Sequence, residues 1–374
     1  MNEDILPLET LERLSRQDGL DTRPILLRVL TDLFVQKPDR SSEEVARYEE
    51  LASRLLEVVG LDARAAVARK LADDPGAPAS LIERLIADDV AAAAPILARF
   101  PDVPRARLIT LAREGGPVEA SAIASRTDID SELVRILVRH PDDLALESLV
   151  ANQAARLADG PLAALVERAA TSPGLATALL RRTDLDAAAL APLYLHADPT
   201  RRAEIREALA SRSARSVFSQ RPARGAELLA AAIEAAMKTE GSGESIAAAL
   251  GEALSLRPDE AARLATEPSG EPFVLMLRAA GAEPDLATRA LLLAQPDIAV
   301  SVHRVFALVD IAETTSRAVA GEIIAALTGR SDRAFAARHE PLFEPQGVME
   351  RAGAARPARR PTRRAGEFRV RGGG

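Results

Sequence analysis

The chain of 374 residues contains no cysteine and no tryptophan. Disulfides, thiolate metal sites and cysteine nucleophiles are therefore excluded. Aromatic residues make up only 3% of the sequence, so we expect an interior of Ala, Leu, Ile and Val between closely packed helices. No apolar run reaches the roughly 18 residues of a membrane span, and the first residues lack the basic and apolar regions of a secretory signal. These absences predict a folded, cytoplasmic protein.

Catalytic and cofactor-binding motifs are missing as well. Neither of the Gly-rich patterns that cradle phosphates occurs. The histidines stand at least 36 residues apart and form no metal-ligand motif; they are His140, His196, His303 and His339. His140 and His196 each precede a loop containing Asp and Pro, where a histidine at a helix C-terminus interacts favourably with the helix dipole. We expect no metal, no cofactor and no enzymatic activity.

Three equally spaced loop-to-helix signatures indicate an internal repeat. They are centred on Pro78, Pro104 and Asp130, at steps of 26 residues. A similar stretch around Asp186 follows after 56 residues, which is two steps of 28. Apolar residues recur at the spacing of one helix face within a unit, as they do from Leu81 to Ile86. A unit of this length holds two short helices, and the period predicts an α-solenoid in which each helix pair buries its apolar face against its neighbours.

Pairs of adjacent aspartates recur with the repeat, at Asp73-Asp74, Asp88-Asp89 and Asp142-Asp143. Two neighbouring carboxylates could supply a general acid and a general base, because their pKa values move apart. A residue that returns at every unit boundary is better explained as a helix cap, since an Asp side chain accepts hydrogen bonds from the free N–H groups of a first turn. We therefore interpret these pairs as structural.

Residues 1–62 precede the repeats and are predicted to form N-terminal helices. The spacing of Leu8, Leu11 and Leu14 indicates the first helix. Two more are expected at 23–35 and 42–59, the second of which begins with the capping sequence Ser41-Ser-Glu-Glu44. Residues 63–198 then form the array of repeats.

From residue 199 the expected helices lengthen and the short repeat fades. Residues 199–330 are predicted to continue the array with degenerate units or to form a helical cap on it. A joint rich in Gly and Ser at 239–244 separates two of the helices. Residues 331–374 lose periodicity, and we expect them to be disordered. The helices expected between 199 and 330 are Pro199–Ala210, Ala223–Met237, Glu244–Leu256, Pro258–Ala265, Pro272–Ala280, Pro284–Ala294, Ile298–Val309 and Ser316–Leu327.

Several stretches of the sequence resemble a known bacterial family. They are Thr31-Asp-Leu-Phe34, Ser41-Ser-Glu-Glu44, Leu71-Ala-Asp-Asp-Pro75 with Ala77-Pro78, Leu85-Ile-Ala-Asp-Asp89, Ala94-Pro-Ile-Leu97, Ile123-Ala-Ser-Arg126 and the segment from Glu271-Pro-Phe273 to Ala280-Gly281. Together they are similar to the domain-of-unknown-function family 2336, over most of residues 6–330. The resemblance implies a HEAT-like α-helical repeat fold and a bacterial origin. It implies no activity, because the family's function is unassigned and it has no catalytic residues to carry over.

The C-terminal end of the chain is strongly basic, whereas the rest is acidic. Residues 351–374 hold eight of the 48 basic residues and one of the 55 acidic residues. Such a tail could neutralise phosphates of a nucleic acid or of an anionic lipid surface. It could also fold back on the acidic body or serve only as a solubilising extension. The candidate anion-binding residues are Arg356, Arg359, Arg360, Arg363, Arg364, Arg369 and Arg371.

These features favour a non-enzymatic scaffold that binds another protein or a peptide, because stacked helix pairs offer an extended surface that needs no catalytic group. Nucleic-acid binding through the arginine-rich tail is the alternative. A basic groove on the body is disfavoured, because a nucleic acid is a dense line of negative charge and the body is acidic. An enzyme is a third possibility for which the sequence offers no residues. The identity of any partner and the oligomeric state stay open.

Overall fold

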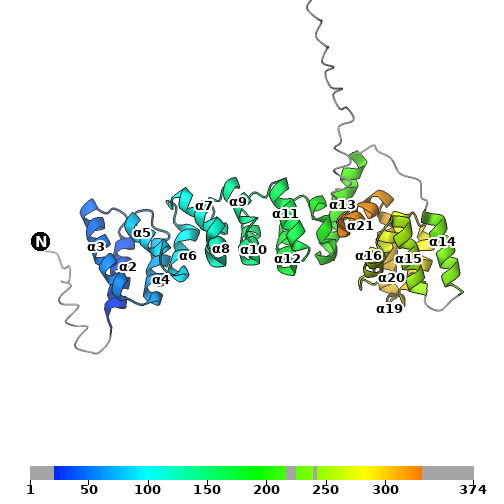
Figure 1. The fold of residues 1–374 in the computed structure, drawn as a ribbon, viewed down its shortest axis with the longest axis horizontal. Coiled ribbons are helices and arrows are strands. Elements are labelled where there is room, and N and C mark those ends of the chain that lie inside the picture. The colour runs from blue at the N-terminus through cyan, green and yellow to red at the C-terminus, as the bar shows by residue number, and fades with distance from the viewer. Residues whose placement is uncertain (1–20, 216–224, 239–241, 331–374) are drawn as a thin grey trace, which may run out of the picture. The chain divides into compact units, whose positions relative to one another are not determined.

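The computed structural model describes residues 21–215, 225–238 and 242–330 (Figure 1). Regular structure in these ranges consists of helices, with no strand among them, which confirms the all-α prediction. The chain divides into two units, residues 1–330 and 331–374. The helix expected around Leu8, residues 239–241 of the expected joint and the whole arginine-rich tail lie outside the described residues, whereas residues 242–244 of that joint are helical.

The helices follow one another with short connections. The first group comprises α2 (Arg23–Gln36), α3 (Ser42–Val58), α4 (Leu61–Leu71), α5 (Ala79–Ile86), α6 (Val90–Arg99), α7 (Arg105–Glu114), α8 (Pro117–Ala124), α9 (Ser131–Leu137), α10 (Asp143–Ala151), α11 (Asp159–Ala169) and α12 (Pro173–Arg181). The second comprises the 3₁₀ helix η1 (Ala187–His196), α13 (Pro199–Arg215), α14 (Gly225–Ala236), α15 (Ser242–Leu254), α16 (Pro258–Ala265), α17 (Glu271–Ala280), α18 (Pro284–Ala294), α19 (Pro296–Ala299), α20 (Val302–Thr314) and α21 (Arg317–Leu327). No helix of these described ranges is long and apolar enough to cross a membrane.

The first group is a stack of helix pairs. The paired helices α5 and α6, α7 and α8, α9 and α10, and α11 and α12 contact each other. The second helix of each pair also contacts the second helix of the next pair, so that α4, α6, α8, α10 and α12 form one continuous inner layer. Each short helix therefore buries its apolar stripe against its neighbours, which confirms the predicted solenoid of short HEAT-like helix pairs.

The predicted repeat boundaries coincide with the starts of the first helices of the pairs. Pro78, Pro104 and Asp130 are the N-caps of α5, α7 and α9, and Asp186 is the N-cap of η1. Ala158, the N-cap of α11, lies 28 residues after Asp130. It marks the start of the unit between Asp130 and Asp186, for which the sequence showed no signature. The two prolines have nearly the same backbone angles, φ −59° and ψ 127° against φ −54° and ψ 125°. These two boundaries thus have the same local geometry, whereas Asp130 starts its helix with φ −97° and ψ 170°.

The second group is arranged around one central helix. In α17 every side chain from Pro272 to Ala280 is buried except that of Arg278. A helix that is apolar all round must be covered on all sides, and α14, α15, α16, α18, α20 and α21 contact it. Gly270 begins this helix with a φ of 76°, in the left-handed region, and a Cβ there would overlap Ile298 and lie 2.9 Å from Leu308 Cδ1. Glycine therefore lets α17 enter the interior.

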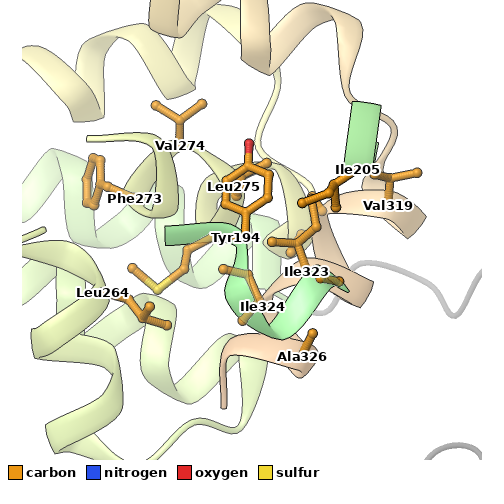
Figure 2. Packing of buried hydrophobic residues seen from close by; sticks show 14 of the residues in the cluster. Tyr194, Ile205, Leu264, Phe273, Val274, Leu275, Val319, Ile323, Ile324 and Ala326 are labelled. Atoms are coloured by element: carbon orange, nitrogen blue, oxygen red, sulfur yellow. The ribbon is translucent and has the colours of Figure 1, made fainter. Parts of the chain in front are cut away.

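The apolar core is continuous between the array and the second group. One buried cluster extends from Leu146 in α10 to Ala326 in α21, and another covers the earlier helices from Leu27 to Ala155. η1 contacts both α12 and α21, and Figure 2 shows its Tyr194 ring near Leu275 of α17 and Ile323 and Ile324 of α21. The last helix, α21, also contacts η1 and α13.

Two predicted helices were wrong in their limits. The expected helix Pro199–Ala210 continues to Arg215 as α13. The expected helix Ile298–Val309 is two elements, the short α19 and then α20. Ser301 separates them, because its side chain accepts a hydrogen bond from the N–H of Arg304 and caps the start of α20. The apolar periodicity continues across this cap and hides the break from the sequence pattern.

Buried polar side chains after the inner helices link consecutive units. Arg126, which follows α8, donates hydrogen bonds to the carbonyl oxygens of Leu97 (2.9 Å) and Phe100 (3.0 Å) at the end of α6. Asn152, the C-cap of α10, donates through Nδ2 to the carbonyl of Ala124 (2.8 Å) and to that of Arg126 (2.7 Å) at the end of α8. Each side chain thus satisfies last-turn carbonyls that the preceding inner helix leaves without a partner.

The same contact recurs in the next units. Arg182, the C-cap of α12, is only 2% exposed. Its guanidinium donates to the carbonyls of Val150 (3.3 Å), Asn152 (3.0 Å) and Ala155 (3.1 Å) at the end of α10 and beyond it. Arg201 of α13 in turn donates to the carbonyl of Arg182 (2.7 Å). We call these four side chains the carbonyl ladder: Arg126, Asn152, Arg182 and Arg201.

We expect Arg182→Met to lower the free energy of unfolding by about 2 kcal/mol or more, because the buried carbonyls of Val150 and Ala155 lose their side-chain donor at roughly 1–3 kcal/mol each. Arg168→Met is the matched control. Arg168 is 47% exposed and pairs with Asp143 at 2.9 Å, so its loss should cost less than about 1 kcal/mol. Urea denaturation followed by circular dichroism measures both. Equal effects of the two substitutions would contradict a structural role for the ladder.

Candidate functional site

The acidic pairs that recur with the repeat are divided between two structural tasks. Asp89 and Asp142 are the N-caps of α6 and α10, and their carboxylates accept hydrogen bonds from the N–H groups of Ala91 (3.0 Å) and Leu144 (2.9 Å). Their partners in each pair bind arginines of other helices: Asp88 with Arg64 and Asp143 with Arg168. The cap interpretation is confirmed for one aspartate of each of these two pairs.

The pair Asp73-Asp74 departs from the cap interpretation. The N-cap of the following helix α5 is Pro78, and neither aspartate caps it. Asp73 instead pairs with Arg99 of the next unit at 2.8 Å. Asp74 is buried beside Arg40 at 2.8 Å and accepts a hydrogen bond from the N–H of Gly76. Asp74 stands four residues before Pro78, too early in the chain to cap the first turn of α5.

Most of the buried polar side chains outside the ladder hold helices together. At the N-terminal end, the guanidinium of Arg40 lies 4.0 Å from the ring centroid of Phe34, which stacks on Tyr48 at 3.9 Å. The Tyr48 hydroxyl shares a hydrogen bond with Thr31 at 3.0 Å. Burial raises the pKa of Tyr48 to about 12. This phenol therefore stays protonated in the physiological range and is unsuited to acid–base catalysis near neutral pH.

A second buried cluster joins η1 and α13 to α17. The Tyr194 hydroxyl donates a hydrogen bond to Glu271 Oε2 (2.9 Å) and accepts one from Nη1 of Arg206 (2.5 Å). Arg202 reaches the same carboxylate at 3.3 Å and donates to the carbonyls of Ala197 and Leu195. Burial, together with the negative charge of Glu271, raises the pKa of Tyr194 well above its usual range. The cluster joins η1 and α13 to α17, with two arginines against the one carboxylate of Glu271.

A hollow of about 240 Å³ lies next to this junction, between α13 and the turn from α20 to α21. The charged residues in its lining are Arg206 and Glu207. They carry opposite charges, so the lining favours neither an anion nor a cation. Among the described residues, no group of three or more His, Asp or Glu side chains could hold a metal ion.

The histidines are dispersed, as the sequence indicated. His140 is buried, and its Nδ1 accepts a hydrogen bond from the N–H of Asp142 at 3.2 Å. This hydrogen bond orders the turn before α10. His196 is the last residue of η1 and His303 is exposed on α20. His339 lies outside the described residues.

The seven arginines of the candidate anion site all lie in the tail, outside the described ranges, so the structure brings none of them to a site. They are Arg356, Arg359, Arg360, Arg363, Arg364, Arg369 and Arg371.

An exposed apolar surface at the start of α20 was not anticipated from the sequence. Val300 is 85% exposed, and Val302 and Phe306 are each 69% exposed. We call these three residues the α20 patch. Helix α20 buries Leu308 and Ala312 on its other side, so the patch is the outward face of a packed helix. An outward Phe with two neighbouring valines is the composition of a contact surface, because single exposed apolar residues are common but clustered ones are not.

The sequence contains a signal for this patch that periodicity analysis passes over. Val302 and Phe306 lie four residues apart and so share one face of the helix, while Val305, Leu308 and Ala312 follow the face that packs inward. The helix is therefore apolar on two faces. Only tertiary packing decides which of the two becomes the core.

The sequence of this region matches a known protein family. Residues 92–324 match the model of an uncharacterised protein conserved in bacteria, the domain-of-unknown-function family 2336. The chain belongs to this family. The match begins in α6 and ends in α21, so the family 2336 region contains the carbonyl ladder, the buried helix α17 and the α20 patch. Comparisons with curated proteins and with solved structures gave no match.

The family match is shorter than the resemblance noted in the sequence. It confirms the similarity from Ala92 onward, including Ala94-Pro-Ile-Leu97, Ile123-Ala-Ser-Arg126 and the Glu271-Pro-Phe273 stretch. The stretches at Thr31, Ser41, Leu71 and Leu85 precede the matched region of family 2336. In the structure, α2 to α5 nevertheless join the array, because α4 and α5 both contact α6.

Asp128 and Asp184, which pair with arginines of the carbonyl ladder, predict that stability falls in acid. Hydrogen bonds from the guanidinium groups of Arg126 and Arg182 lower the pKa of Asp128 and of Asp184. A carboxyl whose pKa is lowered by folding contributes stability above its unfolded pKa, about 3.9, and loses that contribution as the pH falls through its folded pKa. We expect the free energy of unfolding to decrease between about pH 5 and pH 2.

The double variant Asp128→Asn with Asp184→Asn should show a flatter decrease over this range, with lower stability than the wild type at pH 6 and similar stability at the acid end. Asp102→Asn, at an exposed carboxylate, is the control and should follow the wild-type curve. Urea denaturation at each pH measures the difference. Parallel curves for wild type and double variant would refute the assignment.

Proposed function

We propose that this family 2336 protein is a cytoplasmic, non-enzymatic scaffold that binds another protein or a peptide, and that the α20 patch is part of the contact surface. The observation that supports the proposal most is the exposure of Phe306 together with Val300 and Val302. Burying such side chains against a partner contributes roughly 1.5–3 kcal/mol each, and aromatic anchors dominate the energies of many interfaces.

The use of the polar side chains supports the same proposal. Buried arginines, which in an active site would be candidates for binding substrate, donate here to helix carbonyls in the ladder or pair with Glu271 at the junction. The recurrent aspartates cap helices or pair with arginines. Since these groups are engaged within the fold, we place recognition on apolar surface. The partner segment should present apolar side chains, most simply from one face of a helix that packs against Val302 and Phe306.

A capture experiment with matched variants tests the proposal. The full-length chain is immobilised and exposed to extract of the source bacterium, and bound proteins are quantified by mass spectrometry. The double variant Val302→Ser with Phe306→Ser should reduce capture of a specific partner by about 30-fold or more, which corresponds to an anchor of 2 kcal/mol. Because both residues are exposed, folding should change by less than about 0.5 kcal/mol for each substitution.

The control is Val118→Ser, at a residue that is 43% exposed on α8, and it should capture the same proteins as the wild type. Circular dichroism of all three proteins excludes unfolding as the cause of a difference. If no protein is captured above background, the scaffold proposal fails. If the double variant captures as much as the wild type, the α20 patch is not the contact surface.

Nucleic-acid binding through the tail is the second candidate, supported by the arginine content of residues 351–374. Each phosphate contact by an arginine releases a counterion, so affinity should fall steeply with salt concentration. Filter binding of duplex DNA and of RNA at low salt, with the full chain and with a chain ending at residue 350, should then show affinity only for the full chain. Equal binding by both chains, or binding by neither, would contradict a role for the tail.

A further inference from the structure

The first described helix, α2, is apolar on two faces. Its inner face buries Leu27 and Phe34. Its outer face carries Ile25, Val29 and Leu33, which are 63%, 48% and 62% exposed. These three residues lie four apart and form one row along the helix. We call this row the α2 stripe.

The α2 stripe is unusual for the end of a helical array. Terminal units normally present a polar outer face to water, since no further unit covers them. Within the described part of the chain, α2 contacts α3 and α4. These contacts use the inner face, and the stripe stays exposed. None of the described helices covers this row.

The segment directly before α2 has the sequence of such a cover. Residues 1–20 lie outside the described part, so the argument for them is from sequence alone. Leu8, Leu11 and Leu14 recur at the spacing of one helix face. Glu9 and Arg13 would lie on the opposite face of the same helix. This is the pattern of an amphipathic helix that buries one side.

The leucines also match the α2 stripe in register. In an antiparallel helical hairpin, residues at equal distances from the turn face each other. A turn centred near Leu20 sets Leu14 opposite Ile25, Leu11 opposite Val29 and Leu8 opposite Leu33. The connection from about residue 17 to 22 contains Gly19 and falls within the 2–8 residues usual between packed helices.

A second copy of the chain is a weaker candidate for covering the stripe. Three aliphatic side chains bury roughly 100 Å² each, which is far below the about 1,200 Å² of a stable interface. A tethered segment needs less area, because the connection keeps it at a high effective concentration next to the stripe.

We propose that the α2 stripe is the docking surface for the chain's own N-terminal segment, with Leu8, Leu11 and Leu14 packed on Leu33, Val29 and Ile25. The segment would then cap the array. This proposal is independent of the α20 patch and of the function assigned to it.

The absence of cysteine from the chain makes a disulfide test possible. Leu11→Cys and Val29→Cys are introduced together into the full-length protein, which is then oxidised under dilute conditions. Docking places the two residues face to face, within the roughly 7 Å between Cα atoms that a disulfide requires. We expect most chains to form an intrachain disulfide, detected as a monomer of altered mobility without reductant. The matched control is Arg13→Cys with Val29→Cys, which should crosslink at least about fivefold less because Arg13 faces away.

Interchain disulfides, seen as a covalent dimer, would overturn the proposal in favour of a second copy. Equal crosslinking of the two variants, or none in either, would also overturn it. Hydrogen exchange provides a measurement without cysteines. Replacing Leu8, Leu11 and Leu14 by Ser in the full chain should speed exchange of the α2 amides, whereas replacing Glu9 and Arg13 by Ser should not. Unchanged exchange after the leucine substitutions would count against docking.

Discussion

Buried carbonyl groups at the ends of short helices are the constraint on which this fold depends. Every α-helix leaves its last four C=O groups without an intrahelical partner, and a helix of about ten residues has a large share of its backbone in that state. In a stack of helix pairs the inner ends are covered by the next unit, where water cannot reach them. Arg126, Asn152 and Arg182 each extend from one unit to the helix end of the unit before. The carbonyl ladder thus joins neighbouring units by donating hydrogen bonds to carbonyls that lack an intrahelical donor.

This use of polar side chains has a consequence for function. Arginine is suited to the ladder because its planar guanidinium carries five donors, so one side can meet two carbonyls while the other pairs with Asp128 or Asp184. The same groups are then unable to bind substrate. For this reason we propose contact surfaces at the exposed apolar side chains of α20 and α2.

Much of the helical order could be predicted from the sequence, since it follows from local rules. Pro, Asp and Ser at helix starts marked α16 and α18 at their observed limits and placed the boundaries at Pro78, Pro104 and Asp130. The repeated Arg-Thr-Asp at 126–128 and 182–184 marks two arginines of the carbonyl ladder in the sequence. That these arginines bind carbonyls of the preceding unit could not be predicted from it. Those arginines bind carbonyls about 30 residues away in the chain, and no local pattern reports such a contact. The break at Ser301 between α19 and α20 could not be predicted for a similar reason. One side chain caps α20 there, within an apolar periodicity that continues without interruption.

By itself, the sequence determined that this chain is a series of short amphipathic helices repeated at steps of 26 to 28 residues, because helix caps and apolar periodicity act over a few residues. Tertiary structure alone decided which apolar faces became core. Helices α2 and α20 each offer two such faces, and only the position of neighbouring helices buries Leu27 and Leu308 while leaving Val29 and Phe306 in water. It also decided that α17 is enclosed on all sides and that α21 returns to η1. Contacts of this kind join residues far apart in the chain, where burial depends on the whole arrangement and not on local sequence.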